Sequence, residues 1–337
     1  MTGRERVKAA LHFSSPDRAP RDIWPLPGMY LFQQGDLGAI EAEYPMDMAW
    51  CPLSERKNSE SLERLRQPGQ YTDDWGCVWH VGEPGVIGEV KEPILDSWSG
   101  LDNYQPPWHL LKGRDFQEAN RCCDRSDRFM LSGMTAQPFE RMQFLRGTEN
   151  LYMDLAYNTA EFRRLLEMVH EYFLNEVESW CRSNVDGIFF QDDWGSNRGL
   201  LISPNAWRDL FKPLYKDYCE RIHAAGKFAM FHSDGQISSI IGDLIEIGVD
   251  AVNAQLFCMN IEQLAADHKG KITFWGEIDR QHALAFGTVQ EIEAAVRRVR
   301  GSLDDSTGGV IAQCSWGPDN PIENIRAVYR SWIDPIA

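Results

Sequence analysis

The sequence lacks an excess of basic residues, since its 34 Lys and Arg are outnumbered by 50 Asp and Glu and the formal net charge is −16. A protein that holds nucleic acid by its phosphates needs a basic surface, so we expect no nucleic-acid partner. The sequence also lacks an apolar run long enough to cross a bilayer, and its start, MTGRERVKAALHF, has no signal-peptide core. We therefore expect no membrane partner and a cytoplasmic protein.

Paired cysteine motifs are missing as well. The eight cysteines form no CxxC pair, and a chain of 337 residues does not need disulfides to hold a core together. We expect most of these cysteines to be buried thiols, and we assign no role to the adjacent Cys122 and Cys123. Cys314 differs because of its place at the end of a hydrophobic run.

Short buried runs alternate with amphipathic segments over residues 126–337, and this alternation is typical of parallel βαβ units. Six strands are legible, in RFMLSGM, GIFFQDD, FAMFHSDG, AVNAQ, ITFWGEID and GVIAQC. We predict an α/β fold, a single (β/α)8 TIM barrel over residues 1–337. RDIW and part of the irregular region 21–125 would supply the remaining strands.

Residues 21–125 are irregular and rich in Pro, Gly and Trp. This stretch is too long for one loop, so we expect a cap or insertion beside the barrel. Within it, TDDWGCVWHVGEPGVIGEVKEPI has short alternating runs broken by glycine, which predicts a β-hairpin. Before it, TGRERVKAALHF predicts a helix with Thr2 as its N-cap.

Polar side chains stand where the predicted strands end, and the carboxyl ends of barrel strands converge on one cleft. His232 and Asp234 follow one strand with the same parity, Glu277 follows another, and Cys314 ends the last. One His, one Cys and carboxylates form a donor set that suits zinc. We rank the expected ligands as His232 and Cys314, then Glu277, then Asp234; whether Glu277 or Asp234 is the third ligand is left open.

A purely structural interpretation stands beside this one. His232 would then be a core histidine, Glu277 would pair with Arg280 or Arg198, and Asp234 would cap the helix that begins near Ile237.

The other polar and aromatic residues at these strand ends are candidates for catalysis and substrate binding. Asp192 and Asp193 are the candidate general acids, and because adjacent strand residues point to opposite faces, only one of them is expected to face the cleft. The candidates for substrate binding are Trp194, Arg198, Asn253, Trp275 and Trp316, with Trp75 as a further aromatic residue at this end.

Three stretches resemble the uroporphyrinogen decarboxylase superfamily, and within it the cobalamin-linked methyltransferase branch. They are the opening TGRERVKAALHFSSPDRAPRD, the long DDWGSNRGLLISPNAWRDLFKPLYKDYCERIHAAGKFAMFHSDG and the ending GGVIAQCSWGPDNPIENIRAV. The resemblance implies a single barrel with its active site at the carboxyl-end cleft. The decarboxylases have an arginine-rich motif near the first strand, whereas RDIWPLPGMYLF has one arginine. The methyltransferase branch holds zinc by His-x-Cys and a final Cys, and here His232 and Cys314 match while Asp234 replaces the first cysteine.

We therefore expect a zinc-dependent methyltransferase that moves a methyl group from a small O-methyl compound, with an aryl methyl ether as one candidate, to cobalamin carried by a partner corrinoid protein. A carboxylate in place of a thiolate leaves the zinc a stronger Lewis acid, which favours an oxygen ligand. The alternatives are a decarboxylase of a small acid, held by Arg198, Arg208 or Lys212, and a non-catalytic module that binds metal or corrinoid. Whether the chain forms a homodimer is left open.

Overall fold

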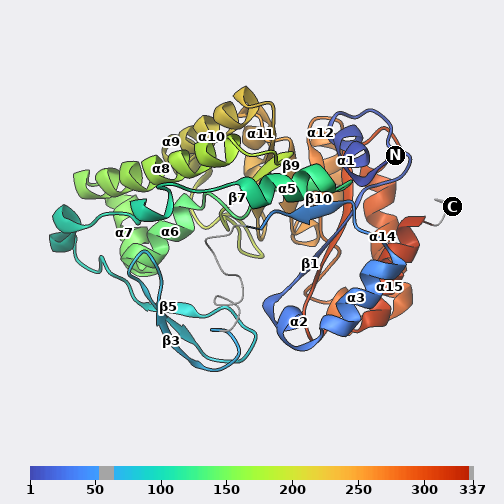
Figure 1. Cartoon of the computed structure of the whole chain (residues 1–337), viewed down its shortest axis with the longest axis horizontal. Helices are drawn as coiled ribbons and strands as arrows, with labels where there is room; N and C mark the ends of the chain where they lie inside the picture. The colour runs from blue at the N-terminus through green and yellow to red at the C-terminus, as the bar shows by residue number, and fades with distance from the viewer. Residues whose placement is uncertain (53–63, 334–337) are drawn as a thin grey trace.

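Eight parallel strands form a nearly closed barrel in the computed structural model, which describes residues 1–52 and 64–333 (Figure 1). Their hydrogen-bonded order is β1-β11-β10-β9-β8-β7-β6-β2, and the seam between β1 and β2 is crossed by a bond from Asp47 N to Arg21 O of 2.9 Å. The predicted (β/α)8 barrel is confirmed, and its first two strands come from RDIW and from the irregular region. The strands are β1 (Arg21–Pro25), β2 (Met48–Trp50), β6 (Phe129–Leu131), β7 (Gly187–Gln191), β8 (Phe228–Ser233), β9 (Ala251–Ala254), β10 (Thr273–Gly276) and β11 (Val310–Trp316).

The helices cover the outside of the barrel and bury apolar faces against it. Residues 203–226 form two helices, because Pro213 lies in the first turn of the second and cannot continue a helix from the first. The helices outside the barrel are α2 (Pro27–Phe32), α3 (Gln34–Glu43), α5 (Gln117–Arg125), α6 (Pro138–Arg146), α7 (Thr148–Tyr157), α8 (Ala160–Cys181), α9 (Pro204–Leu210), α10 (Lys212–Ala224), α11 (Ser238–Glu246), α12 (Ile261–His268), α13 (Ala283–Phe286), α14 (Val289–Leu303) and α15 (Ile322–Ile333), with short 3-10 turns η1 (Trp98–Asn103), η2 (Trp108–Leu110) and η3 (Leu256–Cys258).

Helix α1 (Gly3–Leu11) closes the amino end of the barrel. Thr2 and Glu5 form a reciprocal capping box at its start, which confirms the predicted N-cap. Val7 and Leu11 pack with barrel-interior residues such as Met48 in one buried cluster. The opposite, carboxyl end is therefore the end that is left for a functional cleft.

The interior of the barrel is filled by alternate residues of each strand. Within β11, Ile311 packs in the interior cluster, whereas Ala312 and Cys314 belong to the outer core under the helices. The odd-numbered positions of β11 therefore face inward, and this parity decides which of its side chains reach the site.

A small antiparallel sheet lies beside the barrel (Figure 1). It comprises β3 (Gly69–Thr72), β4 (Val78–Val81) and β5 (Glu89–Glu92), and the β4–β5 pair is the predicted hairpin. Asp73 ties this sheet to α6, because it accepts hydrogen bonds from Trp79 Nε1 at 3.0 Å and from Arg141 Nη1 at 2.8 Å. Residues 21–125 thus supply two barrel strands as well as this added sheet.

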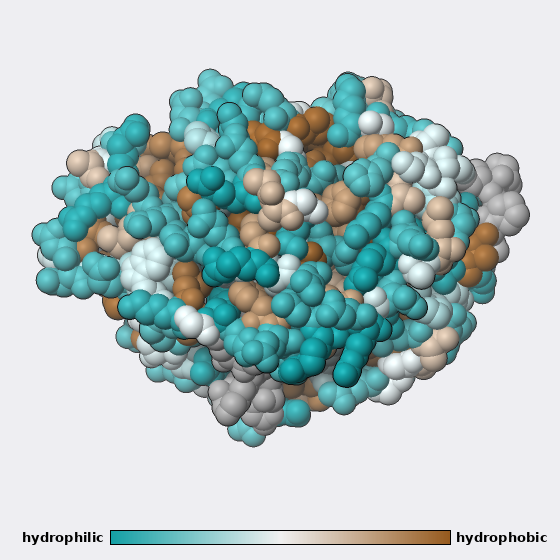
Figure 2. All heavy atoms as spheres, turned by 45° about the horizontal axis from the view of Figure 1, so that its top comes forward, coloured by the Kyte–Doolittle hydropathy of each residue, from teal (hydrophilic) through white to brown (hydrophobic). Residues whose placement is uncertain are grey.

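One face of the molecule is mostly polar. Figure 2 shows hydrophilic residues over most of this face, with hydrophobic residues scattered between them. Within the described residues, the helices are either too short or too polar to pass through a lipid bilayer.

Candidate metal centre at the barrel mouth

Three potential metal ligands converge at the carboxyl ends of β7 and β8. Asp193 follows β7, His232 lies near the end of β8, and Asp234 follows it directly. Their ligand atoms all lie within 4.8 Å of one another, and His232 Nε2 is 3.5 Å from both Asp193 Oδ1 and Asp234 Oδ1. The buried Asp234 Oδ1 has no hydrogen-bond partner, so an acceptor lone pair points into this group.

Asn253 of β9 fixes the orientation of the histidine. Its Nδ2 donates to Trp275 O at 2.6 Å, which turns its Oδ1 toward His232 Nδ1 at 2.6 Å. An amide oxygen only accepts, so Nδ1 carries a proton, and in the neutral ring the lone pair is on Nε2, the nitrogen that faces the two carboxylates. This is the arrangement that orients a histidine for metal binding. Asn253, expected to bind substrate, instead acts on His232.

Arg280 lies in the loop after β10 and joins the group to Glu277. Its guanidinium donates to Asp234 Oδ2 and, at 3.3 Å, to Glu277 Oε1. Glu277 also accepts from Ser315 Oγ at 2.7 Å, and burial raises its pKa. Glu277 thus pairs with Arg280, as in the structural alternative, and it lies outside the group of three ligand atoms, bordering the site through Arg280.

Cys314 is not brought to this group, contrary to the prediction. Its Sγ is fully buried and lies 3.6 Å from Tyr329 Oη of α15, on the outer face of β11. Burial raises the pKa of this thiol to about 12. The inward neighbour, Ser315, takes the position facing the site.

Asp192 and Asp193 have different environments, as their strand parity predicts. Asp192 is fully buried and accepts from the backbone N–H groups of Phe139 and Glu140 and from Tyr215 Oη. It therefore caps the start of α6 and does not face the mouth, which corrects its assignment as a catalytic residue. Burial raises the pKa of Asp192 to about 7. Asp193, by contrast, keeps 40% of its side chain exposed and accepts from Asp234 N at 2.9 Å.

Glu140, in the first turn of α6, was missed by the sequence analysis. Its Oε2 accepts from Gln191 Nε2 at 3.2 Å, and Gln191 ends β7 just before the two aspartates. Burial raises the pKa of Glu140 well above its usual range, and the charges of Asp193 and Asp192 act in the same direction. Glu140 is therefore a carboxyl group beside the metal candidates that favours its protonated form.

The tryptophans expected to bind substrate lie in the core. Trp194 stacks on Phe139 with 4.1 Å between ring centroids, Trp275 and Trp316 are fully buried, and Trp75 packs on Tyr172. Arg198 lies exposed in the loop after β7.

Two other tryptophans, at the ends of β1 and β2, reach the mouth. The ring of Trp24 lies 5.1 Å from that of His232 and 5.9 Å from that of Trp50, and Trp50 is 38% exposed. Phe189 of β7 completes this aromatic wall, with its ring 4.9 Å from that of Trp50. Trp24 has the same inward parity on β1 as Asp22, and Trp50 has the same inward parity on β2 as Met48. These strands are short, so their alternation is hard to recognise in the sequence.

Below this wall, Asp22 is a buried carboxyl group that accepts from Trp24 Nε1 at 2.8 Å and Trp275 Nε1 at 2.9 Å. Burial raises its pKa from 3.8 to about 7. As the pH rises from about 4 to about 7, the unfolded chain loses this proton while the folded chain keeps it, so stability falls across this window and levels off above it. The titration of Asp22 lowers the free energy of unfolding by up to about 4 kcal/mol across this window.

We expect the Asp22→Asn variant to lose this part of the pH dependence. Urea unfolding of both proteins between pH 4 and pH 8 measures it, and the variant should gain stability relative to the parent as the pH rises. A constant difference between the two proteins would show that Asp22 does not titrate in this window.

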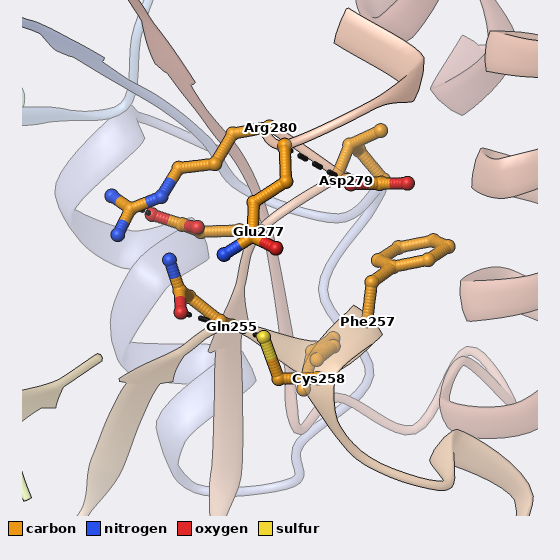
Figure 3. Close-up of a pocket in the computed structure, with 9 residues that line it drawn as sticks. Gln255, Phe257, Cys258, Glu277, Asp279 and Arg280 are labelled. Atoms are coloured by element: carbon orange, nitrogen blue, oxygen red, sulfur yellow. Dashed lines mark hydrogen bonds and ion pairs between the residues drawn. The ribbon is translucent and has the colours of Figure 1, made fainter. Parts of the chain in front are cut away.

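A pocket opens beside Arg280 (Figure 3), with about 260 Å³ of empty space, part of it open to solvent. The Arg280 guanidinium points toward the Glu277 carboxylate, and Gln255 faces Cys258, whose Sγ lies 3.5 Å from Gln255 Oε1. Because Glu277 and Arg280 line this pocket, solvent reaches the edge of the group of Asp193, His232 and Asp234 here.

The group of Asp193, His232 and Asp234 fits a zinc ion. One imidazole nitrogen and two carboxylate oxygens are ligands that zinc accepts, and Asp234 Oδ1, which accepts no hydrogen bond, faces His232 Nε2 at 3.5 Å. Asp234, expected here as the last-ranked ligand, is in the group, and Asp193 takes the place that the prediction gave to Cys314 or Glu277. The donor set is harder than the predicted one, because it has no thiolate.

Comparisons with known proteins agree with the fold. Residues 73–332 match the family described as "Uroporphyrinogen decarboxylase (URO-D)". A solved methyltransferase from Methanosarcina mazei is similar in structure, with a TM-score of 0.73 and 15% sequence identity over 99% of this chain and 98% of that one. An endo-β-1,4-xylanase from Gloeophyllum trabeum is more distant, with a TM-score of 0.47 and 10% identity over 98% of this chain and 100% of that one. The search of curated proteins finds no match.

Proposed function

Because the chain belongs to the uroporphyrinogen decarboxylase family, we propose that it is a zinc-dependent methyltransferase of this family. In this proposal it moves a methyl group from a small O-methyl compound to the cobalamin of a partner corrinoid protein. The observation that carries the proposal is the hydrogen-bonded chain from Trp275 O through Asn253 to His232, which leaves Nε2 free beside Asp193 and Asp234. The similar methyltransferase fold supports it.

The donor set favours an oxygen substrate. A zinc ion held by Asp193, His232 and Asp234 would supply Lewis acidity toward the oxygen of the methyl donor. Two carboxylates and one imidazole match a hard oxygen atom better than a soft thiol.

The aromatic wall of Trp24, Trp50 and Phe189 supports an aryl methyl ether as the donor. An aromatic ring can stack on the exposed part of Trp50, whose ring contacts Trp24, the ring beside His232.

Glu140 is the residue we assign to proton transfer. Once the methyl group leaves, the donor oxygen must gain a proton, and Glu140 is a carboxyl group that its surroundings keep protonated beside Asp193. Gln191 holds the Glu140 carboxyl through its Nε2. Asp192, which the sequence suggested for this role, is occupied by the start of α6.

The decarboxylase alternative needs basic residues in the cleft to hold a carboxylate substrate. Arg208 and Lys212 instead pair with Asp243 on the outer helices, at 2.9 and 2.8 Å. At the site itself Arg280 is bound to Asp234 and Glu277, so we prefer the methyltransferase. A non-catalytic binding module would bind metal without turnover.

The test is methyl transfer to cob(I)alamin, a soluble stand-in for the partner corrinoid. The zinc-loaded protein is incubated with methoxylated aromatic compounds and, separately, with aliphatic methyl ethers and methanol, and methylcobalamin is followed by its absorbance. We expect transfer from at least one aryl methyl ether. Metal binding without transfer from any donor would favour the binding module and contradict the proposal.

The Glu140→Gln variant should transfer methyl groups about 100-fold more slowly, in the range typical of a lost general acid. The slowing should shrink for donors whose phenol is acidic, because a better leaving group needs its proton less. The substituted amide keeps the shape of the side chain, so zinc content should not change. An equal slowing for all donors would indicate that Glu140 only positions its neighbours.

A further inference from the structure

Cys51 and Cys123 lie close together although 72 positions separate them, with 3.2 Å between their sulfur atoms. Cys51 comes directly after β2, and strand alternation turns it outward because Met48 faces the barrel interior. Cys123 lies on α5 one turn after Ala119, and these are the two buried residues of that helix. The strand end and the helix thus present one thiol each to a shared, buried contact.

We infer that Cys51 and Cys123 form a reversible oxidation site, at which hydrogen peroxide converts the two thiols into an intramolecular disulfide. A disulfide has about 2.0 Å between its sulfur atoms, so bond formation needs an approach of roughly 1 Å. Cys122, the neighbour of Cys123, lies partly exposed on another side of α5 and has no part in this contact.

Burial determines the oxidant. Cys51 is 5% exposed and Cys123 is 1% exposed, so a small uncharged oxidant reaches them more readily than a bulky charged disulfide. The hydrogen bond from Cys51 lowers the pKa of Cys123, whereas the same contact and burial raise the pKa of Cys51. Cys123 is therefore the thiol that reacts first as a thiolate.

The reaction balances with one peroxide molecule. The Cys123 thiolate attacks one peroxide oxygen, the O–O bond breaks, and protonation of the released hydroxide gives water and a sulfenic acid. The Cys51 sulfur then attacks the Cys123 sulfur and displaces its hydroxyl group, which leaves as a second water with the Cys51 proton. Two thiols are oxidised by two electrons in total, and the peroxide is reduced to two waters.

The bond would act on the site through β2. Cys51 follows Trp50, whose ring belongs to the aromatic wall beside His232. Joining Cys51 to α5 fixes the end of β2, and it also closes a long loop in the unfolded chain, which should raise the midpoint of thermal unfolding. This inference does not depend on the proposed methyl transfer.

Thiol counting tests the site on the full-length protein. The folded protein is treated with hydrogen peroxide, catalase removes the excess, and thiols are counted after denaturation with and without dithiothreitol. We expect the count to fall from eight to six and to return to eight on reduction. Peptide mapping without reduction should show one peptide containing Cys51 linked to one containing Cys123.

Two variants provide matched controls. Cys122→Ser has seven thiols and should lose two, whereas Cys123→Ser has seven and should keep all of them at the same dose. Cys51→Ala replaces the second variant if that one does not fold. A count that stays at eight, a bond between other cysteines, or loss of thiols without a cross-link would overturn the inference.

Discussion

The His232→Ala variant is expected to lose its metal, while Cys314→Ala keeps it. The parent protein, purified and dialysed with zinc, should hold about one zinc ion per chain. Removing the imidazole takes away the nitrogen ligand, so we expect the zinc Kd to rise at least about 100-fold. Cys314 lies on the outer face of β11 against Tyr329, so its loss should leave zinc content unchanged.

The measurement is metal content by elemental analysis, together with a competition titration against a chelator of known affinity. Methyl transfer by His232→Ala should fall with its zinc content. Loss of zinc from Cys314→Ala would mean that β11 turns its thiol inward when metal binds, and zinc retained by His232→Ala would place the ion elsewhere. The Cys314→Ala variant thus distinguishes the ligand set predicted from sequence, which includes Cys314, from the candidate set of Asp193, His232 and Asp234.

The adjacent aspartates should give opposite results in a second pair of variants. Asp192→Ala removes the acceptor of two N–H groups of α6 and of the buried Tyr215 hydroxyl, so it should lower the free energy of unfolding by about 3 kcal/mol. Asp193→Ala removes a half-exposed carboxylate from among other carboxylates. In the metal-free protein it should change stability by less than about 1 kcal/mol, but it should release zinc.

Urea unfolding in the presence of a chelator gives both stabilities, and elemental analysis gives the zinc content. A large loss of stability in Asp193→Ala with normal zinc would reverse the two roles. Similar results for the two variants would show that Asp192 and Asp193 do not differ in placement, one in the core and the other in the cleft.

The barrel could be predicted from sequence because its later strands are buried runs separated by amphipathic helices. The first strand was predicted at RDIW, but β2 was harder to recognise, since it spans only Met48–Trp50 and lies in an irregular region. Trp50 was missed with β2, and Trp24 was missed although Asp22 and Trp24 have the two-residue spacing of one strand face.

The candidate metal site was predicted in part from the sequence. His232 and Asp234 were identified because both follow a legible strand with the same parity. Cys314 was misplaced because all seven residues of β11 are buried, so burial alone does not reveal which face each residue joins. The polar Gln313 and Ser315 on either side of it are the signal that marks the inward face.

Other residues of the site could not be predicted from the sequence, because their positions depend on tertiary structure. Glu140 comes from the start of a helix and Arg280 from a loop, and neither position follows a strand pattern. The Asn253 bond to His232 requires the register of β8 against β9, which pairs the two residues directly. A sequence pattern gives the order of the strands but not these cross-strand partners.

The side chains at the barrel mouth come from two parts of the chain. Asp193, His232, Asp234 and Arg280 come from β7, β8 and the loop after β10, inside the family-matched residues 73–332, whereas Trp24 and Trp50 precede that region. Trp24 and Trp50 therefore lie at the seam between β1 and β2, whereas Phe189, the third residue of the aromatic wall, lies on β7 within the matched residues. Substitutions at Trp24 and Trp50 would therefore change the aromatic part of the mouth and leave the side chains of Asp193, His232 and Asp234 in place.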